Sequence, residues 1–331
     1  MDEFFAAFGS PLPSGLPSLA GATGWLNTEP LTVDDLTGRV VLVGFWTYTC
    51  INWIRTAPYL RSWAEAYGPA GLVVVGVHSP EFTVEHDVDR VLRAVRARRL
   101  DYSIAIDNDY AVWDAFGNRY WPALYVADHE GRLRHHNFGE RGYEQSEQVL
   151  RQLLVDSGAV NLPDELTPVD PQGIELASDW DNLRSAETYV GYARSHGFAS
   201  PGGGTPETAR VYSSPRELLT NQWALTGNWT IRAEDAVLNE ANGSIAYRFH
   251  ARDLNLILAP TQDDSPARFR VRLDGQPPHD AHGLDVDGDG HGIVSETRLY
   301  QLIRQPGPIS DRVFLIEIFD GGASALCFTF G

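Results

Sequence analysis

The sequence predicts two domains, an α/β domain followed by an all-β antiparallel sandwich of jelly-roll type. The chain has 331 residues, which exceeds the usual size of one domain. Strand and helix patterns alternate in the first half, which is typical of an α/β fold. In the second half apolar and polar residues alternate between Gly, Pro and Asp turns, which is typical of antiparallel strands. We place the first domain at residues 1–158, a linker at 159–178 and the sandwich at 179–331.

The first domain alternates predicted strands with predicted helices. Apolar runs, two of them continuous enough for buried strands, predict the sheet at 40–46, 71–77, 103–107, 123–127 and 133–138. Apolar residues at helical spacing predict helices at 50–67, 84–99, 110–116 and 144–154. The turn at 128–131 joins the last two strands, so we expect the sheet to end in an antiparallel pair.

Helical periodicity nearly disappears after a stretch rich in Pro, Asp and Gly, which is the predicted linker. Beyond it, apolar residues occupy every second position in five runs, at 245–249, 254–258, 269–273, 314–318 and 326–330. This period of two predicts strands with one face buried. A sandwich of about 150 residues has a normal domain size.

Composition excludes several function classes. Acidic residues outnumber basic ones 44 to 26, and the net charge of −18 argues against a nucleic-acid partner. All basic residues are arginine, so lysine-dependent phosphate loops and Schiff-base chemistry are excluded. The longest strongly apolar stretch, 40–53, is too short and too polar for membrane insertion. The first ten residues lack the pattern of a signal peptide, so we expect a cytoplasmic protein.

Cys50 is the most informative residue of the sequence. It follows the buried strand 40–46 and opens the helix 50–67, where unpaired backbone N–H groups and the helix dipole favour a thiolate. Thr47 stands three residues earlier and is placed to donate a hydrogen bond to the sulfur. The second cysteine, Cys327, lies far away in an apolar run of the second domain. The two cysteines therefore exclude both a disulfide scaffold and a cysteine-based zinc site.

The residues around Cys50 resemble a known family. The stretch 45–53 (FWTYTCINW) is similar to the active-site segment of thioredoxin-like redoxins of the TlpA and AhpC/TSA type. The likeness continues at 76–82 and 118–123 and covers about residues 24–154. The second half resembles the β-sandwich, similar to a carbohydrate-binding module, that follows the redoxin domain in DipZ-type cytochrome c biogenesis proteins. The resemblance implies a thioredoxin fold and thiol–disulfide chemistry without a catalytic cofactor.

The resemblance also implies roles for residues near Cys50. Pro122 matches the proline that faces the cysteine in thioredoxin folds, and the Trp121–Pro122 bond is expected to be cis. Such a turn exposes the backbone of Trp121 for pairing with an extended substrate. Trp46, Trp53 and Trp121 are the expected substrate-binding residues. Trp46 and Trp121 are expected to flank the sulfur, with core packing as the alternative role.

The sequence departs from the family at one decisive position. The usual motif is Cys-x-x-Cys, and Trp53 stands where the second cysteine belongs. Trp53 is expected to shield one side of the sulfur, and it cannot expel a mixed disulfide. We expect Cys50 to act alone on a peroxide or disulfide, with glutathione or a thioredoxin-like protein as the external thiol. The alternative is a catalytically inactive adaptor whose sandwich binds a sugar or a protein.

An acidic loop in the second domain suggests calcium. Asp285, Asp287, Asp289 and Glu296 fit the spacing of an EF-hand loop, whose carboxylates wrap a Ca²⁺ ion. Helices are not expected on either side of this loop, so the alternatives are a calcium loop within the sandwich or a plain acidic turn.

Overall fold

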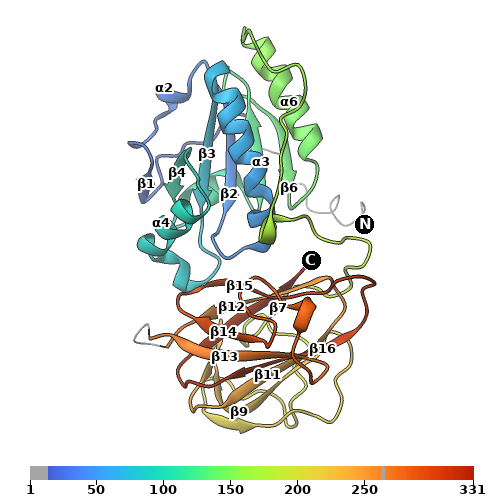
Figure 1. The fold of residues 1–331 in the computed structure, drawn as a ribbon. Coiled ribbons are helices and arrows are strands. Elements are labelled where there is room, and N and C mark those ends of the chain that lie inside the picture. The colour runs from blue at the N-terminus through green and yellow to red at the C-terminus, as the bar shows by residue number, and fades with distance from the viewer. Residues whose placement is uncertain (1–13, 262–264) are drawn as a thin grey trace. The chain divides into compact units, whose positions relative to one another are not determined.

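The computed structural model describes residues 14–261 and 265–331. Backbone contacts divide the chain into two compact units, Met1–Glu175 and Leu176–Gly331, shown in Figure 1. The division falls inside the range predicted as a linker. No helix among the described residues is long and apolar enough to cross a membrane.

A six-stranded sheet forms the centre of the first unit. Its strands are β1 (Gly24–Leu26), β2 (Val40–Trp46), β3 (Leu72–His78), β4 (Ser103–Ile106), β5 (Ala123–Ala127) and β6 (Leu133–Phe138). They are hydrogen-bonded in the order β1-β4-β3-β2-β5-β6. The inner strands β2, β3 and β4 run parallel, whereas β5 and β6 form the antiparallel pair that the sequence predicted. Every residue of β2 is buried, which explains its unbroken apolar sequence.

Five α-helices accompany this sheet in the described part of the unit: α2 (Val33–Leu36), α3 (Ile51–Tyr67), α4 (Val88–Ala97), α5 (Ala111–Phe116) and α6 (Tyr143–Asp156). Helix α4 begins four residues later than predicted. The carboxylate of Asp87 accepts hydrogen bonds from the amides of Asp89 and Arg90 and thereby starts the helix there. The preceding residues form the 3-10 turn η2 (Thr83–His86) instead.

Helix α3, which begins directly after Cys50, packs closely on β2. Gly44 lies in the middle of β2, and a Cβ atom there would come within 2.9 Å of Leu60 Cδ2 on α3. Glycine at this position therefore allows the helix to approach the strand. On β2, Phe45 packs edge-to-face with Phe116 and Tyr125, which belong to an apolar cluster of the unit.

The segment predicted as a linker is tied to the first unit over much of its length. Arg151 on α6 donates to the carbonyl oxygens of Pro163 and Glu165, at 2.6 Å each. The amide of Thr167 donates to the Glu147 carboxylate at 2.6 Å. Arg61 on α3 forms a bidentate ion pair with Glu175 in the 3-10 turn η3 (Gly173–Glu175). These contacts explain why Glu175 falls within the first unit.

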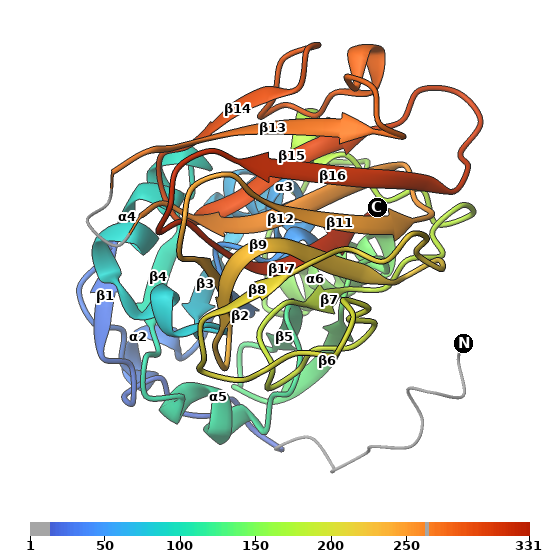
Figure 2. The ribbon, with the colours of Figure 1, turned by 90° about the horizontal axis from the view of Figure 1, so that it is seen from below.

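The second unit is built from antiparallel strands. They are β7 (Thr188–Tyr189), β8 (Arg210–Tyr212), β9 (Trp223–Ile231), β10 (Ala236–Leu238), β11 (Gly243–Phe249), β12 (Asp253–Ala259), β13 (Ala267–Leu273), β14 (His291–Val294), β15 (Arg298–Arg304), β16 (Arg312–Ile318) and β17 (Ser324–Phe330). The five predicted alternating runs coincide with β11, β12, β13, β16 and β17. Figure 2 shows β9, β11, β16 and β13 side by side.

Nine of these strands form one continuous hydrogen-bonded path, β14-β13-β16-β11-β9-β10-β17-β12-β15, while β7 pairs with β17 and β8 pairs with β9. The path folds over, because Phe328 on β17 contacts Tyr247 on β11 and Phe314 on β16, at ring-centroid distances of 4.9 and 6.0 Å. The antiparallel all-β prediction is confirmed. Strand β9 takes part in both halves of the path, because residues 223–226 pair with β11 whereas residues 229–231 pair with β10. The two halves pack against each other as in the predicted sandwich, and a jelly-roll topology stays a prediction.

Five large aromatic residues of the second unit belong to its core. All of them are at most 3% exposed: Tyr212, Trp223, Trp229, Tyr247 and Tyr300. Aromatic rings that stack on sugars must be accessible, so these five do not provide a carbohydrate platform. Sugar binding by this unit stays a prediction.

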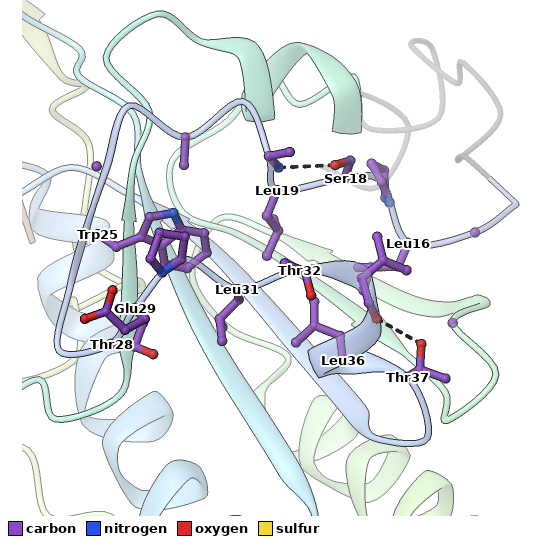
Figure 3. Close-up of a pocket in the computed structure, with 18 of the residues that line it drawn as sticks. Leu16, Ser18, Leu19, Trp25, Thr28, Glu29, Leu31, Thr32, Leu36 and Thr37 are labelled. Carbon is purple, nitrogen blue, oxygen red and sulfur yellow. Dashed lines mark hydrogen bonds between the residues drawn. The ribbon is translucent and has the colours of Figure 1, made fainter.

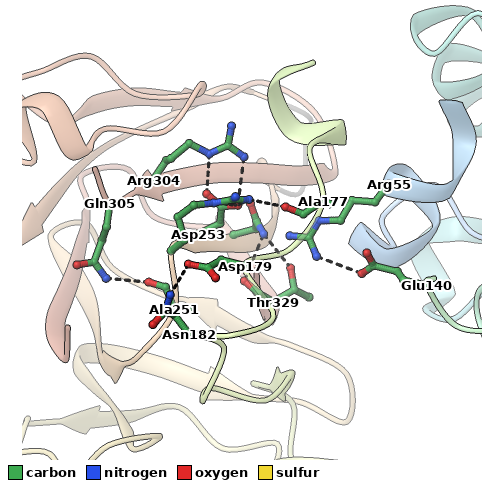
Figure 4. A network of polar contacts seen from close by, with 12 residues as sticks. Arg55, Glu140, Ala177, Asp179, Asn182, Ala251, Asp253, Arg304, Gln305 and Thr329 are labelled. Atoms are coloured by element: carbon green, nitrogen blue, oxygen red, sulfur yellow. Dashed lines mark hydrogen bonds and ion pairs between the residues drawn. The ribbon is translucent and has the colours of Figure 1, made fainter. Parts of the chain in front are cut away.

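An acid between two arginines stabilises one end of β12. Asp253 is fully buried, and its two oxygens lie 2.7 Å from Arg304 Nε and 2.7 Å from an Arg252 nitrogen (Figure 4). Breaking a buried ion pair leaves an uncompensated charge, which is costly. We expect Asp253→Asn to lower the free energy of unfolding by about 3 kcal/mol in denaturant titrations.

The exposed pair Arg268–Asp320 provides the matched control for that variant. Asp320→Asn is expected to cost less than about 1 kcal/mol, because solvent screens exposed pairs. Equal losses in the two variants would show that burial does not strengthen the Asp253 interactions.

Candidate active site around Cys50

Cys50 lies at the junction that the sequence predicted. It is the residue that precedes α3, with extended backbone angles, and its carbonyl accepts the first helical hydrogen bond from Ile54 at 3.0 Å. The side chain is buried, with 8% of the residue exposed. The amide of Cys50 donates to the carbonyl of Thr47 at 3.3 Å, so the connecting loop is a tight turn. A role of the Thr47 hydroxyl toward the sulfur stays a prediction.

The turn at Trp121 and Pro122 faces the sulfur. The peptide bond between these residues is cis, as the resemblance implied. Cys50 Sγ lies 3.9 Å from the carbonyl oxygen of Trp121, to which the thiol donates. The indole Nε1 of Trp121 donates to the carbonyl of Ser79 at 3.0 Å, which fixes the ring against the end of β3. The structure therefore brings Cys50, Trp121 and Pro122 together.

Trp46 and Trp53 form a stacked pair inside the unit. Their ring centroids are 4.2 Å apart with an interplanar angle of 24°, and both residues are at most 1% exposed. An indole stacked in this way fills the position three residues after Cys50 with a rigid apolar group. Both side chains are interior packing residues rather than an open substrate surface. The packing role is the alternative that the sequence left open for Trp46, and direct substrate binding by Trp46 or Trp53 stays a prediction.

Two buried polar residues near this loop were not predicted as functional. His78, the last residue of β3, lies edge-on to Trp46 and parallel to Tyr48, at centroid distances of 4.8 and 5.9 Å. Complete burial lowers the pKa of His78 to about 3, so the ring is neutral at neutral pH. Sequence reasoning included His78 only as part of a family motif, because a histidine at a strand end is usually solvated.

Glu85 is the second such residue. It is fully buried, and Thr49, next to Cys50, donates its hydroxyl to Glu85 Oε1 at 2.6 Å. Burial raises the pKa of Glu85, and the charge of Glu81 adds to that effect. Glu85 falls in the predicted helix 84–99, where no role was predicted for it. Its role became visible only because Thr83–His86 forms a 3-10 turn beside the cysteine loop.

The calcium loop is not assembled. Asp285 instead pairs with Arg298 at 2.6 Å and accepts the amide of Gln301 at 2.7 Å. Asp287 accepts the amides of Asp289 and His291 and so closes a turn before β14. Glu296 forms an ion pair with Arg298 at 3.3 Å. No cluster of three or more potential metal ligands occurs within residues 14–261 and 265–331, so the proposed site is corrected to an acidic turn.

A cavity of about 850 Å³ in the first unit lies away from Cys50. Residues 15–37 and the turn 129–131 line it, and Figure 3 shows Leu19, Trp25, Leu31 and Leu36 around it. None of the residues that surround Cys50 contributes to its wall. The cavity is therefore separate from the candidate active site.

Comparison with known proteins agrees with this geometry. The model of the AhpC/TSA family matches residues 17–136, and the model of the thioredoxin like C-terminal domain matches residues 185–331. Protein DipZ of Mycobacterium tuberculosis is 36% identical over 289 residues, which cover 86% of this chain and 39% of DipZ. The chain thus spans about two fifths of the length of that relative.

Shorter relatives match the first unit alone. The thiol-disulfide oxidoreductase YkuV of Bacillus subtilis is 32% identical over 143 residues, which cover 43% of this chain and 95% of YkuV. The solution structure of a thioredoxin-like protein in the oxidized form shares 31% identity and covers 43% of this chain and 96% of that protein, with a TM-score of 0.40. The chain belongs to the thioredoxin-like redoxin family, with an AhpC/TSA-type domain followed by a thioredoxin-like C-terminal domain.

Proposed function

We propose that the chain is a thiol–disulfide oxidoreductase in which Cys50 is the only reacting thiol. The observation that carries this proposal is the contact between Cys50 Sγ, at the start of α3, and the Trp121 carbonyl at the cis-Pro122 turn. A helix start favours the thiolate, which is the nucleophile in disulfide exchange. The name and coverage of YkuV support the same reaction class.

The proposed reaction has two exchange steps. The Cys50 thiolate attacks one sulfur of a substrate disulfide, forms a mixed disulfide and releases the other sulfur as a thiolate. Trp53 offers no second thiol, so an external thiol must attack the mixed disulfide. That attack regenerates Cys50 and transfers the substrate half to the external thiol as a new disulfide. Glutathione or a thioredoxin-like protein would serve as this external thiol, and no cofactor is needed.

A peroxide is the second substrate class, favoured by the match to the AhpC/TSA family. In this reaction the thiolate attacks a peroxide oxygen, the O–O bond breaks, and Cys50 becomes a sulfenic acid while water or an alcohol leaves. Two external thiols then restore Cys50 and form a disulfide. The rival function is an inactive adaptor, which is favoured by the limited exposure of Cys50 and by Trp53 at the resolving position.

Intact-mass spectrometry tests the monothiol reaction directly. We expect glutathione disulfide to add one glutathione per chain, which peptide mapping should place on Cys50 and which reduced glutathione should remove. Cys327 on β17 is fully buried and is expected to stay unmodified in the folded protein. If no adduct forms on Cys50, the proposal of an oxidoreductase is wrong and the inactive adaptor is the better explanation.

A further inference from the structure

One segment of the first unit contacts both walls of the Cys50 site. Residues 79–86, here termed the bracing segment, connect β3 to the capping residue of α4. On one side, the carbonyl of Ser79 accepts the indole N–H of Trp121. On the other side, Glu85 accepts the hydroxyl of Thr49 at 2.6 Å, and the carbonyl of Val84 accepts the hydroxyl of Tyr48 at 3.4 Å. The cysteine loop and the proline turn are thus both hydrogen-bonded to the same short segment.

The bracing segment is itself organised around the Glu85 carboxylate. Oε2 accepts the amide of Glu81 at 2.6 Å and the amide of Phe82 at 3.0 Å, while Oε1 accepts Thr49 Oγ1. Within the described residues Glu85 forms no ion pair, so hydrogen-bond donors rather than a cation offset its burial. A fully buried acid without a cation costs stability. An apolar residue at this position would leave the Thr49 hydroxyl and two backbone amides without their acceptor, so the carboxylate holds these three groups together.

The far end of the bracing segment is equally fixed. Ser79 Oγ donates to Asp107 Oδ2 at 2.8 Å, and the same carboxylate accepts the amides of Val112 and Trp113 at the start of α5. The hydroxyl of Tyr110 donates to the carbonyl of Pro80. The segment is therefore anchored next to the sheet and at the start of α5, and it can fix the position of the cysteine loop.

We propose that Glu85 is a positioning residue that acts through Thr49 and holds the Cys50 sulfur against the Trp121–Pro122 turn. This inference rests on the proposed disulfide exchange and deepens it. Thr49 is the residue before Cys50, so its side-chain bond fixes the backbone that carries the sulfur. Exchange requires the attacking sulfur and the two substrate sulfurs to be aligned, whereas a small alkylating reagent needs only access to the thiolate.

The test compares Thr49→Val, which keeps the size of the side chain but removes its hydroxyl, with Thr49→Ser, which keeps the hydroxyl. We expect Thr49→Val to lower kcat for exchange with a model peptide disulfide at least tenfold, because small displacements of reacting atoms are costly. KM and the rate of iodoacetamide alkylation are expected to stay near wild-type values. Thr49→Ser should restore kcat, since it restores the bond to Glu85.

Glu85→Gln and Glu85→Leu provide a second pair of variants. The glutamine oxygen can accept both backbone amides while its N–H faces Thr49, so kcat should stay within about threefold of the wild-type value. Glu85→Leu removes every acceptor and should behave like Thr49→Val. Amide hydrogen exchange at residues 47–50 reports whether the Thr49–Glu85 hydrogen bond holds the cysteine loop, independently of turnover. This exchange should accelerate in Thr49→Val and Glu85→Leu.

Three outcomes would overturn the inference. Turnover of Thr49→Val at the wild-type rate, with or without faster hydrogen exchange, would leave Glu85 with a purely structural role. Equal losses of alkylation and turnover would mean that the thiol itself, rather than its position, had changed. Failure of Thr49→Ser to restore kcat would remove the hydroxyl from the mechanism. If instead the wild-type protein exchanges no disulfide, but the amides of residues 47–50 are protected from hydrogen exchange, the proposed function is wrong although the Thr49–Glu85 contact is present.

Discussion

Cys50→Ser is expected to abolish disulfide exchange, with a fall in rate of about a thousandfold or more. The nucleophile in this reaction is a thiolate, and a serine hydroxyl neither ionises at neutral pH nor forms a bond with sulfur. The substitution is nearly isosteric and leaves the backbone bonds of Cys50 to Thr47 and Ile54 intact. The fold and the thermal stability should therefore change little. Reduction of a small disulfide by glutathione, with and without the protein, measures the effect.

Cys327→Ala is the matched control for that variant. Cys327 lies on β17 within the second unit and is fully buried, so its removal should leave exchange unchanged. A Cys50→Ser protein that still turns over, or a Cys327→Ala protein that fails although it is folded, would assign the chemistry to another group. Because Trp53 replaces the second thiol, no intramolecular disulfide of Cys50 within its motif can mask the result.

The position of Cys50 could be predicted because it depends on local sequence. Seven consecutive buried residues of β2 have no other stable environment than a covered sheet, and the pattern after Cys50 has helical spacing. The facing turn at Pro122 is more than 70 residues away in the chain. No periodicity could bring it to the sulfur, and only the family resemblance did so.

The polar surroundings of the site could not be predicted in this way. Glu85 lies inside the range predicted as the helix 84–99, whereas the structure starts that helix after the cap at Asp87 and buries Glu85 in the 3-10 turn before it. The prediction of a calcium site in the acidic loop failed for a related reason. The spacing from Asp285 to Glu296 has the pattern of a calcium loop, but Arg298 at the start of β15 forms ion pairs with two of its carboxylates, Asp285 and Glu296. In both cases a tertiary partner, which the local pattern does not encode, determined the role of the carboxylate.

His78 is expected to make the stability of the first unit depend on pH. Burial depresses its folded-state pKa to about 3, while the unfolded chain titrates near the ordinary value of 6.5. The unfolded state therefore binds more protons between these values. The stabilising contribution is complete above pH 6.5 and is lost as the pH falls toward 3. Between pH 8 and pH 5 this one residue should cost about 2 kcal/mol of unfolding free energy.

His78→Phe should remove this dependence, because phenylalanine fits the aromatic contacts with Trp46 and Tyr48 but cannot be protonated. Denaturant titrations at pH 8 and pH 5 measure the change for each protein, and the wild type should lose about 2 kcal/mol more than the variant. His86 is exposed on the neighbouring turn, so His86→Gln is the matched control and should behave like the wild type. Comparing each variant with the wild type cancels the contribution of the carboxylates to the pH dependence. Glu85 is one of them, and its raised pKa stabilises the folded state as the pH falls, opposite to the effect of His78. If His78→Phe loses as much unfolding free energy between pH 8 and pH 5 as the wild type, His78 is protonated in the folded protein as readily as in the unfolded chain. The side chain would then reach solvent or a hydrogen-bond acceptor, and the packing of His78 against Trp46 and Tyr48 would not exclude water.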